Sequence, residues 1–248
     1  MTHSVIKECV PRLRANISGK RLRELVDAAL GVFCRQGYDR SQVADVAKVM
    51  GVAPGTIYLY VEGKEALFDL VIRHTAADNV EWLDDLEIPV PTPAPSATLA
   101  FLREVFHREG EWPLLEGALR LSSAPEIQTE LAGVLREQYR LMARHRRGLV
   151  LLMRSALEFP GLAEEFVLGL RKRLLDGLTA YLTSRVHAGQ IRPLADTAAT
   201  AAVITQTIAW ANLQRPFDPG LTQLAEEAVE KATLDLLVSG LLPTHPTP

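Results

Sequence analysis

The side chains most capable of chemistry in this sequence are not spaced for catalysis. No metal-ligand spacing joins the six histidines to cysteines or acidic residues. The sequence also lacks the G-x-S-x-G elbow, a Walker loop, G-x-G-x-x-G and H-E-x-x-H. Cys9 and Cys34 are too few for a disulfide framework and fit a reducing compartment. We therefore expect no enzyme, no cofactor and no metal site.

Residues 41–65 instead gather side chains that could bind a polyanion. The segment reads SQVADVAKVMGVAPGTIYLYVEGKE, and its candidate contact groups belong to Ser41, Thr56, Tyr58, Tyr60 and Lys64. Hydroxyls, lysines and the amides at helix starts hold DNA phosphates, and hydroxyls also reach base edges. The chemistry that the segment indicates is therefore recognition of nucleic acid.

Two short helices joined by a tight turn must position these groups. We expect the first helix to begin with Ser41 as its N-cap and to end at Gly51, where glycine supplies a positive φ. Ala47 is small enough to let the second helix cross closely, and Pro54 opens that helix, which runs to about Tyr60. This spacing predicts a helix-turn-helix. Its outward-facing residues are Ala53, Pro54, Gly55, Thr56, Tyr58 and Leu59.

The stretch GVAPGTIYLYVEGKEALF, residues 51–68, resembles the DNA-binding domain of the TetR family of bacterial transcriptional regulators. That family's pattern is Ala-Gly-Val, then Gly-Thr-Ile/Leu-Tyr-x-Tyr-Phe, then Ser-Lys-Glu-x-Leu. The resemblance covers residues 20–68 and implies contacts with double-stranded DNA from Ser41, Thr56, Tyr58, Tyr60 and Lys64. Ala53 and Pro54 stand where the family has a serine and a polar residue. Val61 and Gly63 also depart from the pattern, and fewer side chains remain to read bases.

Several of these residues also fit a purely structural role. Tyr60 could pack in the core or contact phosphate, and Lys64 could be an ordinary solvated charge. The basic N-terminal residues could be a flexible tail or could contact the minor groove; they are Arg12, Arg14, Lys20, Arg21 and Arg23.

The rest of the chain favours helix throughout. Leu and Ala far outnumber the β-branched Val and Ile, and apolar residues recur at helical spacing. We expect an all-α fold in which a helix from Lys64 to about Leu86 precedes a proline-rich loop at residues 88–96, with further helices beyond it. The predicted parts are a basic, flexible arm (1–19), a helix-turn-helix domain (20–66), an effector-binding and dimerisation domain (67–242) and a tail (243–248).

Two late helices indicate a homodimer. Small residues at helical spacing let a neighbouring helix approach closely, although packing within one subunit would need the same pattern. A dimer also reads the paired half-sites of a palindromic operator, which a single helix-turn-helix cannot. The predicted interface comprises Ala198, Ala202, Thr205, Ile208, Ala209, Asn212, Leu224 and Ala228.

A small-molecule pocket is expected between the C-terminal helices, as the resemblance implies. Apolar and aromatic residues there indicate a mostly apolar ligand, although each residue alone also suits an ordinary core. The candidates are Trp112, Leu115, Leu119, Tyr139, Met142, His145, Met153 and Phe166. Either His145 or Arg144 could meet an anionic group of the ligand.

The net charge of −3 conceals an uneven distribution. Residues 1–73 carry 11 Lys and Arg against 8 Asp and Glu, so the basic excess lies on the motif and its arm. The longest uncharged run, residues 197–214, contains too many Thr, Gln and Asn for a lipid-facing helix, and we expect no membrane partner. The sequence thus predicts a cytoplasmic, ligand-responsive transcriptional regulator, acting as a repressor. The alternative is a helical small-molecule-binding or interaction protein with weak or lost DNA binding.

Overall fold

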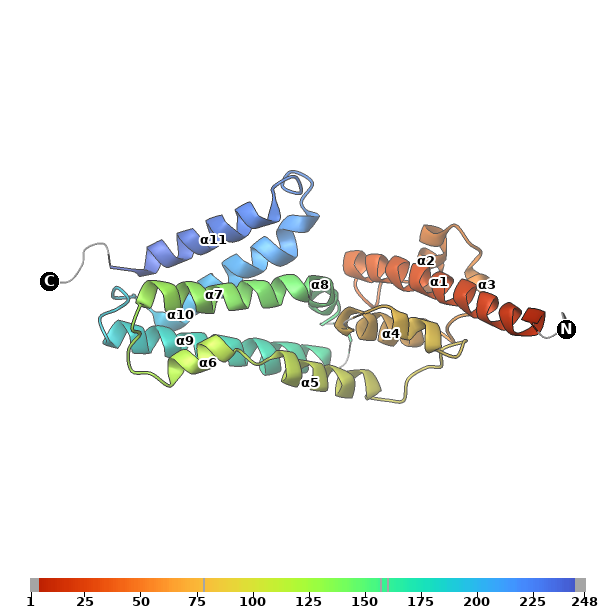
Figure 1. The fold of residues 1–248 in the computed structure, drawn as a ribbon, viewed down its shortest axis with the longest axis horizontal. Helices are drawn as coiled ribbons and strands as arrows, with labels where there is room; N and C mark the ends of the chain where they lie inside the picture. Colours follow the sequence, from red (N-terminus) through yellow and green to blue (C-terminus); the bar gives the residue numbers. More distant parts are fainter. Residues whose placement is uncertain (1–4, 78, 157, 160, 244–248) are drawn as a thin grey trace. The chain divides into compact units, whose positions relative to one another are not determined.

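The computed structural model describes residues 5–77, 79–156, 158–159 and 161–243, and the side chains of residues 5–18, 167 and 168 lie outside its description. The chain divides into two compact units. The N-terminal unit comprises Met1–Glu104 and Val150–Ala163, and the C-terminal unit comprises Val105–Leu149 and Glu164–Pro248. Across the described residues, regular structure is helical apart from one isolated bridge between Val61 and Val90 (Figure 1). The predicted all-α fold is confirmed.

The N-terminal unit is built on the long first helix. Its elements are α1 (Val5–Gln36), α2 (Val43–Met50), α3 (Pro54–Ile57), α4 (Lys64–Ala76), the 3-10 turn η1 (Glu81–Asp85), most of α5 (Ala97–Glu109) and the end of α8 (Arg146–Ser155). α2, α4 and η1 all pack against α1. The helix begins at Val5, inside the segment predicted as a flexible arm, so the described part of that arm is helical.

Four aromatic rings pack together in this unit. Phe33, Tyr38, Phe68 and Phe159 contact one another with ring centroids 4.6 to 6.3 Å apart. Glu158 Oε2 accepts a hydrogen bond from the backbone amide of Asp39 at 3.0 Å. The segment at residues 158–159 thus holds the turn between α1 and α2 although it is more than a hundred residues away in sequence.

The predicted helix from Lys64 to Leu86 is wrong in its length. α4 ends at Ala76, and its C-cap Ala77 has extended backbone. The chain then forms η1, where Leu83 is 1% exposed and buried against α1. Burying Leu83 requires a change of direction that a continuous helix would not allow.

The proline-rich loop at residues 88–96 contains no helix, as predicted. Val90 nevertheless pairs with the end of the helix-turn-helix. Its amide donates to Tyr60 O at 2.8 Å, and its carbonyl accepts from the amide of Glu62 at 3.0 Å. Glu62 Oε2 accepts in turn from the amide of Thr92 at 2.8 Å. The loop therefore anchors the backbone that follows α3.

The C-terminal unit packs its helices around one apolar core (Figure 1). Its main elements are α6 (Pro113–Leu119), α7 (Ile127–Arg144), the π-helical η2 (Glu164–Arg171), α9 (Lys172–His187), α10 (Thr197–Ala209) and α11 (Glu226–Leu241). The π-helical η3 (Trp210–Gln214) and the 3-10 turn η4 (Arg215–Phe217) continue α10. Turns occupy residues 219–223 before α11 begins at Glu226.

Candidate nucleic-acid interface

The turn between α2 and α3 has the geometry that the sequence predicts. Gly51 adopts φ 66° and ψ 31°, a left-handed conformation that favours glycine. The amide of Val52 donates to Ala47 O at 3.0 Å. Ala47 is fully buried and Ile57 is 1% exposed, and α2 packs directly on α3. The small side chain of Ala47 permits this close crossing.

The start of α2 differs from the prediction. The N-cap is Gln42, whose amide donates to Asp45 Oδ2 at 2.9 Å. Ser41 is 1% exposed, and its hydroxyl donates to Gly37 O at 2.5 Å. The hydroxyl therefore closes the α1–α2 turn, and the exposed polar side chain at the start of α2 is that of Gln42. The sequence analysis missed Gln42 because serine is the commoner N-cap.

The second helix of the motif is shorter than predicted. α3 spans Pro54–Ile57, and the residues up to Tyr60 form turns. Ala53, Pro54, Gly55, Tyr58 and Leu59 are exposed, whereas Thr56 and Tyr60 are half-buried. Five of the six residues predicted to face outward are therefore exposed, and Thr56 is half-buried.

Lys64 is held in place at the start of α4. Its Nζ donates to Asp39 O at 3.1 Å and lies 4.2 Å from the ring centre of Tyr38. Burial, followed by the charge and hydrogen bond of Glu65, raises the pKa of Tyr38 to about 12. The lysine thus has a fixed position, and an ammonium group keeps two further N–H donors for an anion.

Comparison with known proteins agrees with this geometry. The family model described as bacterial regulatory proteins, tetR family, matches residues 25–71. The chain is 37% identical over 62 residues to a fatty acid metabolism regulator protein of Bacillus subtilis (strain 168), covering 25% of this chain and 32% of that protein. It is 35% identical over 66 residues to the HTH-type transcriptional regulator LuxR of Vibrio harveyi, covering 27% and 32%. Residues 25–71 thus resemble the DNA-binding domain of the tetR family.

These matches span about a third of the length of the curated relatives. A solved structure extends the similarity of fold to most of the chain. The ketosteroid transcriptional regulator of Mycobacterium tuberculosis aligns with a TM-score of 0.52 at 16% identity, covering 90% of this chain and 95% of that one. The predicted TetR resemblance is confirmed, and this alignment shows that the C-terminal unit also shares the fold.

Several basic residues lie close to the motif in the sequence. Arg40 and Lys48 are exposed, and Lys48 has no hydrogen-bond or ion-pair partner among the described residues. Arg21 pairs with Glu24 at 2.9 Å, and Arg23 pairs with Asp84. Arg12 and Arg14, which we predicted as part of a DNA-binding arm, have side chains outside the described ones.

The predicted pocket residues are partly brought together. Trp112, Leu115 and Tyr139 are buried in the core of the C-terminal unit, and Met142 packs against it. The ring of Phe166 lies 6.1 Å from that of Phe106. Leu119 and Met153 are 38% and 43% exposed, and Met153 belongs to the N-terminal unit. Neither of these two joins the cluster around Trp112.

A groove of about 550 Å³ opens beside this core, between the start of α6 and one face of α7. Apolar groups line its floor: Trp112, Pro113, Leu114 and Leu141. Four arginines line it as well, namely Arg108, Arg136, Arg140 and Arg144. Three of these lie four residues apart on α7, a spacing that the sequence analysis did not use. Trp112 is 6% exposed, and its Nε1 has no hydrogen-bond partner among the described residues.

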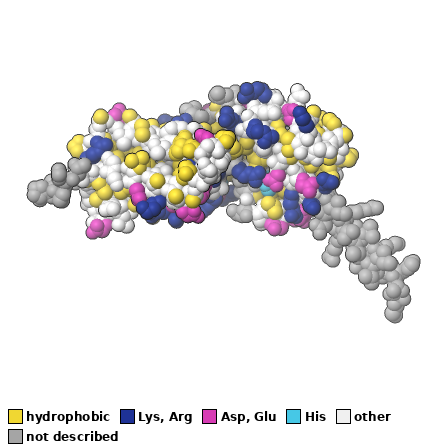
Figure 2. Space-filling view, turned by 90° about the horizontal axis from the view of Figure 1, so that it is seen from above, with side chains coloured by type: hydrophobic (Ala, Val, Ile, Leu, Met, Phe, Trp, Pro, Cys, Tyr) yellow, Lys and Arg dark blue, Asp and Glu magenta, His cyan; other side chains and the backbone are white. Residues whose placement is uncertain are grey.

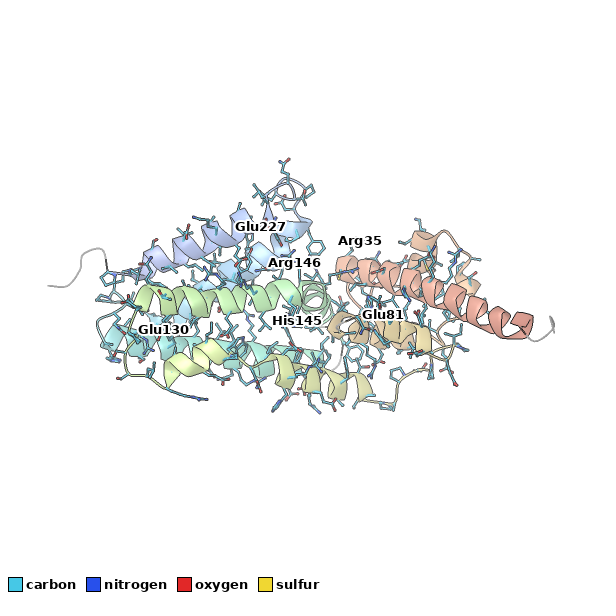
Figure 3. The ribbon with its side chains drawn as sticks, in the orientation of Figure 1. Arg35, Glu81, Glu130, His145, Arg146 and Glu227 are labelled. Atoms are coloured by element: carbon cyan, nitrogen blue, oxygen red, sulfur yellow. The ribbon has the colours of Figure 1, made fainter. Side chains whose placement is uncertain are left out.

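Most acids near the groove are already engaged. Glu137 accepts from the amides of Leu114 and Leu115 at 3.0 and 3.2 Å. Glu109 contacts His145 Nε2 at 3.1 Å. His145 follows the C-terminal end of α7, whereas Glu130 lies near its start (Figure 3). The hydrogen bond from Arg108, together with the charge of His145, holds the pKa of Glu109 below its usual value. Arg144 has no partner among the described residues and is exposed.

The predicted dimer residues fall into two groups. Thr205, Ile208, Ala209 and Asn212 are buried inside the subunit, where Gln138 Nε2 donates to Thr205 Oγ1 at 3.1 Å. The exposed group comprises Ala198, Ala202, Leu224 and Ala228. Three large apolar side chains that were not predicted as interface residues are exposed as well: Val203 (63%), Trp210 (43%) and Leu236 (69%).

The described residues contain no helix long and apolar enough to span a membrane. Within the same part of the chain, no group of three or more His, Cys, Asp or Glu side chains could hold a metal ion.

Proposed function

We propose that this chain is a homodimeric, DNA-binding transcriptional regulator that releases its operator when a small molecule binds. One observation carries the proposal. Ala47 and Ile57 are buried where α2 packs on α3, whereas the residues on the outer side of the motif are exposed, namely Ala53, Pro54, Gly55, Tyr58 and Leu59. A helix-turn-helix of this kind places its second helix in the major groove. The TetR-family match at residues 25–71 supports the same assignment.

Several groups around this face are suited to phosphate contact. Lys64 is fixed against Tyr38 and Asp39, and the hydroxyls of Thr56, Tyr58 and Tyr60 lie on the motif. Such contacts set the register of the protein on the duplex without reading sequence. We retain the proposed phosphate role for Lys64, and we propose the exposed Gln42, in place of the buried Ser41, as the contact at the start of α2.

The dimer would form through the exposed faces of α10 and α11. Val203 and Trp210 lie on α10 and its continuation, and Leu236 lies on α11. Exposed small residues lie on the same two helices, namely Ala198, Ala199, Ala202, Ala228 and Ala232. Hydrophobic side chains are visible among polar ones on the upper face of the molecule (Figure 2). A two-fold dimer would hold two recognition motifs about 34 Å apart, one turn of DNA.

The effector would bind in the groove beside Trp112. Its apolar floor suits a mostly apolar molecule, and the unpartnered Trp112 Nε1 offers a hydrogen bond to it. Arg144 is free to pair with an anionic end group, since arginine binds carboxylates in a bidentate way. We therefore propose an apolar carboxylate or phosphate ester as the chemical class.

Release from DNA would follow from a shift between two dimer states. A ligand changes an equilibrium only by the difference between its affinities for the two states. An effector that binds better to the state with misplaced recognition motifs lowers operator affinity, and DNA in turn lowers effector affinity by the same factor.

A mobility-shift assay with the DNA upstream of the protein's own gene tests the proposal. We expect a shifted complex that survives excess unrelated duplex and weakens as salt rises. Alkyl carboxylates and the alcohols of equal chain length are then added to the complex, and the carboxylates should release the DNA at lower concentration. A folded dimer that shows no salt-sensitive binding to this region would overturn the regulator assignment.

The alternative is a helical binding protein that has lost DNA recognition. The observation that favours it is the motif's own exposed face, which carries no charged or amide side chain between Val49 and Tyr60. Under this alternative the effector would still bind, and no duplex would be retarded at any salt concentration.

A further inference from the structure

The exposed face of the recognition motif has an unusual composition. From Val49 to Tyr60 no side chain carries an ammonium, guanidinium, carboxamide or carboxylate group. Thr56, Tyr58 and Tyr60 supply the only side-chain hydroxyls in this stretch. The face therefore lacks the groups that form two hydrogen bonds with one base.

Its most exposed large side chains belong to two apolar residues, Leu59 and Val49, and to Tyr58, which carries a hydroxyl. Leu59 is 66% exposed, Val49 is 55% exposed and Tyr58 is 51% exposed. Leu59 points outward because Ile57, two residues earlier, is 1% exposed and packs inward. Ala53 and Pro54, at the start of α3, are also exposed and apolar. Single exposed leucines are common in proteins, but here the apolar groups are clustered on the motif that faces DNA.

The four bases present different chemistry in the major groove. Guanine offers two acceptors that suit Arg or Lys, adenine pairs with Asn or Gln, and cytosine donates to Asp or Glu. Thymine presents a C5-methyl group, which apolar side chains contact. Threonine and tyrosine hydroxyls contact more than one base and so select none, whereas the thymine methyl group matches the exposed apolar side chains of this face.

We propose that this face recognises thymine through its C5-methyl groups, with Leu59 as the main specificity-determining residue and Ala53 and Pro54 beside it. This inference rests on the proposed function, because it names the base that the recognition motif reads. Operator half-sites would then be selected for thymine at the positions facing α3, and the hydroxyls of Thr56, Tyr58 and Tyr60 would position the helix on phosphates.

Charge around the patch favours DNA as its occupant over an apolar protein partner. Arg40 and Lys48 are exposed, and Lys64 is fixed beside the motif. An apolar patch with cations near its border matches the major groove, in which thymine methyl groups lie between two rows of phosphates. Glu62 is turned to the loop amide of Thr92.

The experiment begins with selection of bound duplexes from a library with a random central segment. We expect thymines to be enriched at fixed positions in both half-sites. Each enriched thymine is then replaced by deoxyuridine, which keeps every hydrogen-bonding group and removes the methyl group. Loss of one buried methyl group should weaken binding about fourfold, and loss from both half-sites about fifteenfold.

Two variants assign the effect to its residue. Leu59→Ala should bind thymine and deoxyuridine duplexes equally well, because it removes the partner of the methyl group. Leu121→Ala is the matched control, since Leu121 is also exposed, at 49%, and lies in the C-terminal unit. The control should keep the full difference between the two duplexes.

Three outcomes separate this inference from the proposed function. Enrichment of guanine or cytosine at the fixed positions would overturn thymine reading while leaving DNA binding intact. Equal affinity of the unaltered protein for thymine and deoxyuridine duplexes would overturn it as well. A selection that enriches no sequence would instead count against the regulator function on which the inference depends.

Discussion

The ammonium group of Lys64 lies 4.2 Å from the ring centre of Tyr38, which joins the start of α4 to the turn between α1 and α2. Asp39 O accepts a hydrogen bond from the same nitrogen at 3.1 Å. A lysine held by two contacts loses less side-chain entropy when it binds an anion than a free lysine would. The contact therefore prepares Lys64 for a phosphate.

Replacing Lys64 should change the salt dependence of DNA binding. Lys64→Ala removes one phosphate contact per subunit, so the slope of log affinity against log salt should flatten by about one phosphate equivalent for each half-site. Affinity should fall by a similar factor for all sequences. Lys172→Ala, which removes an exposed lysine of the C-terminal unit, serves as the control and should leave the slope unchanged. An unchanged slope in Lys64→Ala would count against the phosphate role.

Tyr38 should also show an abnormal titration. Its pKa of about 12 exceeds the ordinary 10.0 because burial, Glu65 and Asp39 all disfavour the phenolate. A raised pKa in the folded state stabilises the fold below pH 10, and this contribution is lost as pH rises from 10 to 12. The free energy of unfolding should thus fall more steeply in this window for the unaltered protein than for Tyr38→Phe.

The titration can be followed directly by NMR of tyrosine labelled in the ring. Glu65→Gln removes the second-largest cause and should bring the pKa of Tyr38 closer to 10. A Tyr38 resonance that already titrates near pH 10 in the unaltered protein would contradict the assigned environment.

The helix-turn-helix was predictable because its signals are local. Gly51 supplies the left-handed turn and Pro54 opens α3, and both act within a few residues of their position. The role of Ser41 was not predictable in the same way. Its hydroxyl donates to Gly37 O because Gly37, at φ 80°, turns the chain back between α1 and α2. Nothing in the sequence near Ser41 shows that this acceptor outcompetes the amides of α2.

The C-terminal unit was less predictable because its key contacts are distant in sequence. In the sequence, the predicted interface residues from Thr205 to Asn212 suited either a dimer interface or the core of one subunit. The hydrogen bond from Gln138 on α7 shows that Thr205 lies in the core of the subunit. The spacing of Arg136, Arg140 and Arg144 puts them on one face of α7, but the groove that they line depends on the packing of α6 against α7.

A charge on the exposed face of α10 or α11 should break the proposed dimer. Val203→Glu and Leu236→Glu place a carboxylate at side chains that are 63% and 69% exposed, so each subunit should fold normally. Sedimentation should then show a monomer with unchanged helix content. Ala180→Glu on the exposed face of α9 is the control and should stay dimeric. A dimer in both α10 and α11 variants would refute this interface. Ala209, which is 8% exposed, is unsuitable because a charge there would test the subunit core.

Arg185 should be among the residues on which folding of the C-terminal unit depends most. Its side chain has no exposed surface, and its Nε donates to Glu130 Oε1 at 2.7 Å. The remaining guanidinium nitrogens donate to Ala118 O at 2.7 Å and Leu121 O at 2.9 Å, two carbonyls at and just after the end of α6.

Arg185→Met keeps much of the buried volume and removes all of these donors. The free energy of unfolding should fall by about 3–5 kcal/mol, because Glu130 and the α6 carbonyls lose their partner in the interior. Urea unfolding at fixed protein concentration measures the change, since a dimer's stability depends on concentration. Lys172→Met, which breaks the exposed pair with Asp176, should cost less than about 1 kcal/mol.

Adding Glu130→Leu to Arg185→Met should recover part of the loss, because the double variant no longer leaves a carboxylate without its guanidinium. Equal stabilities for Arg185→Met and Lys172→Met would show that the buried network does not support the unit.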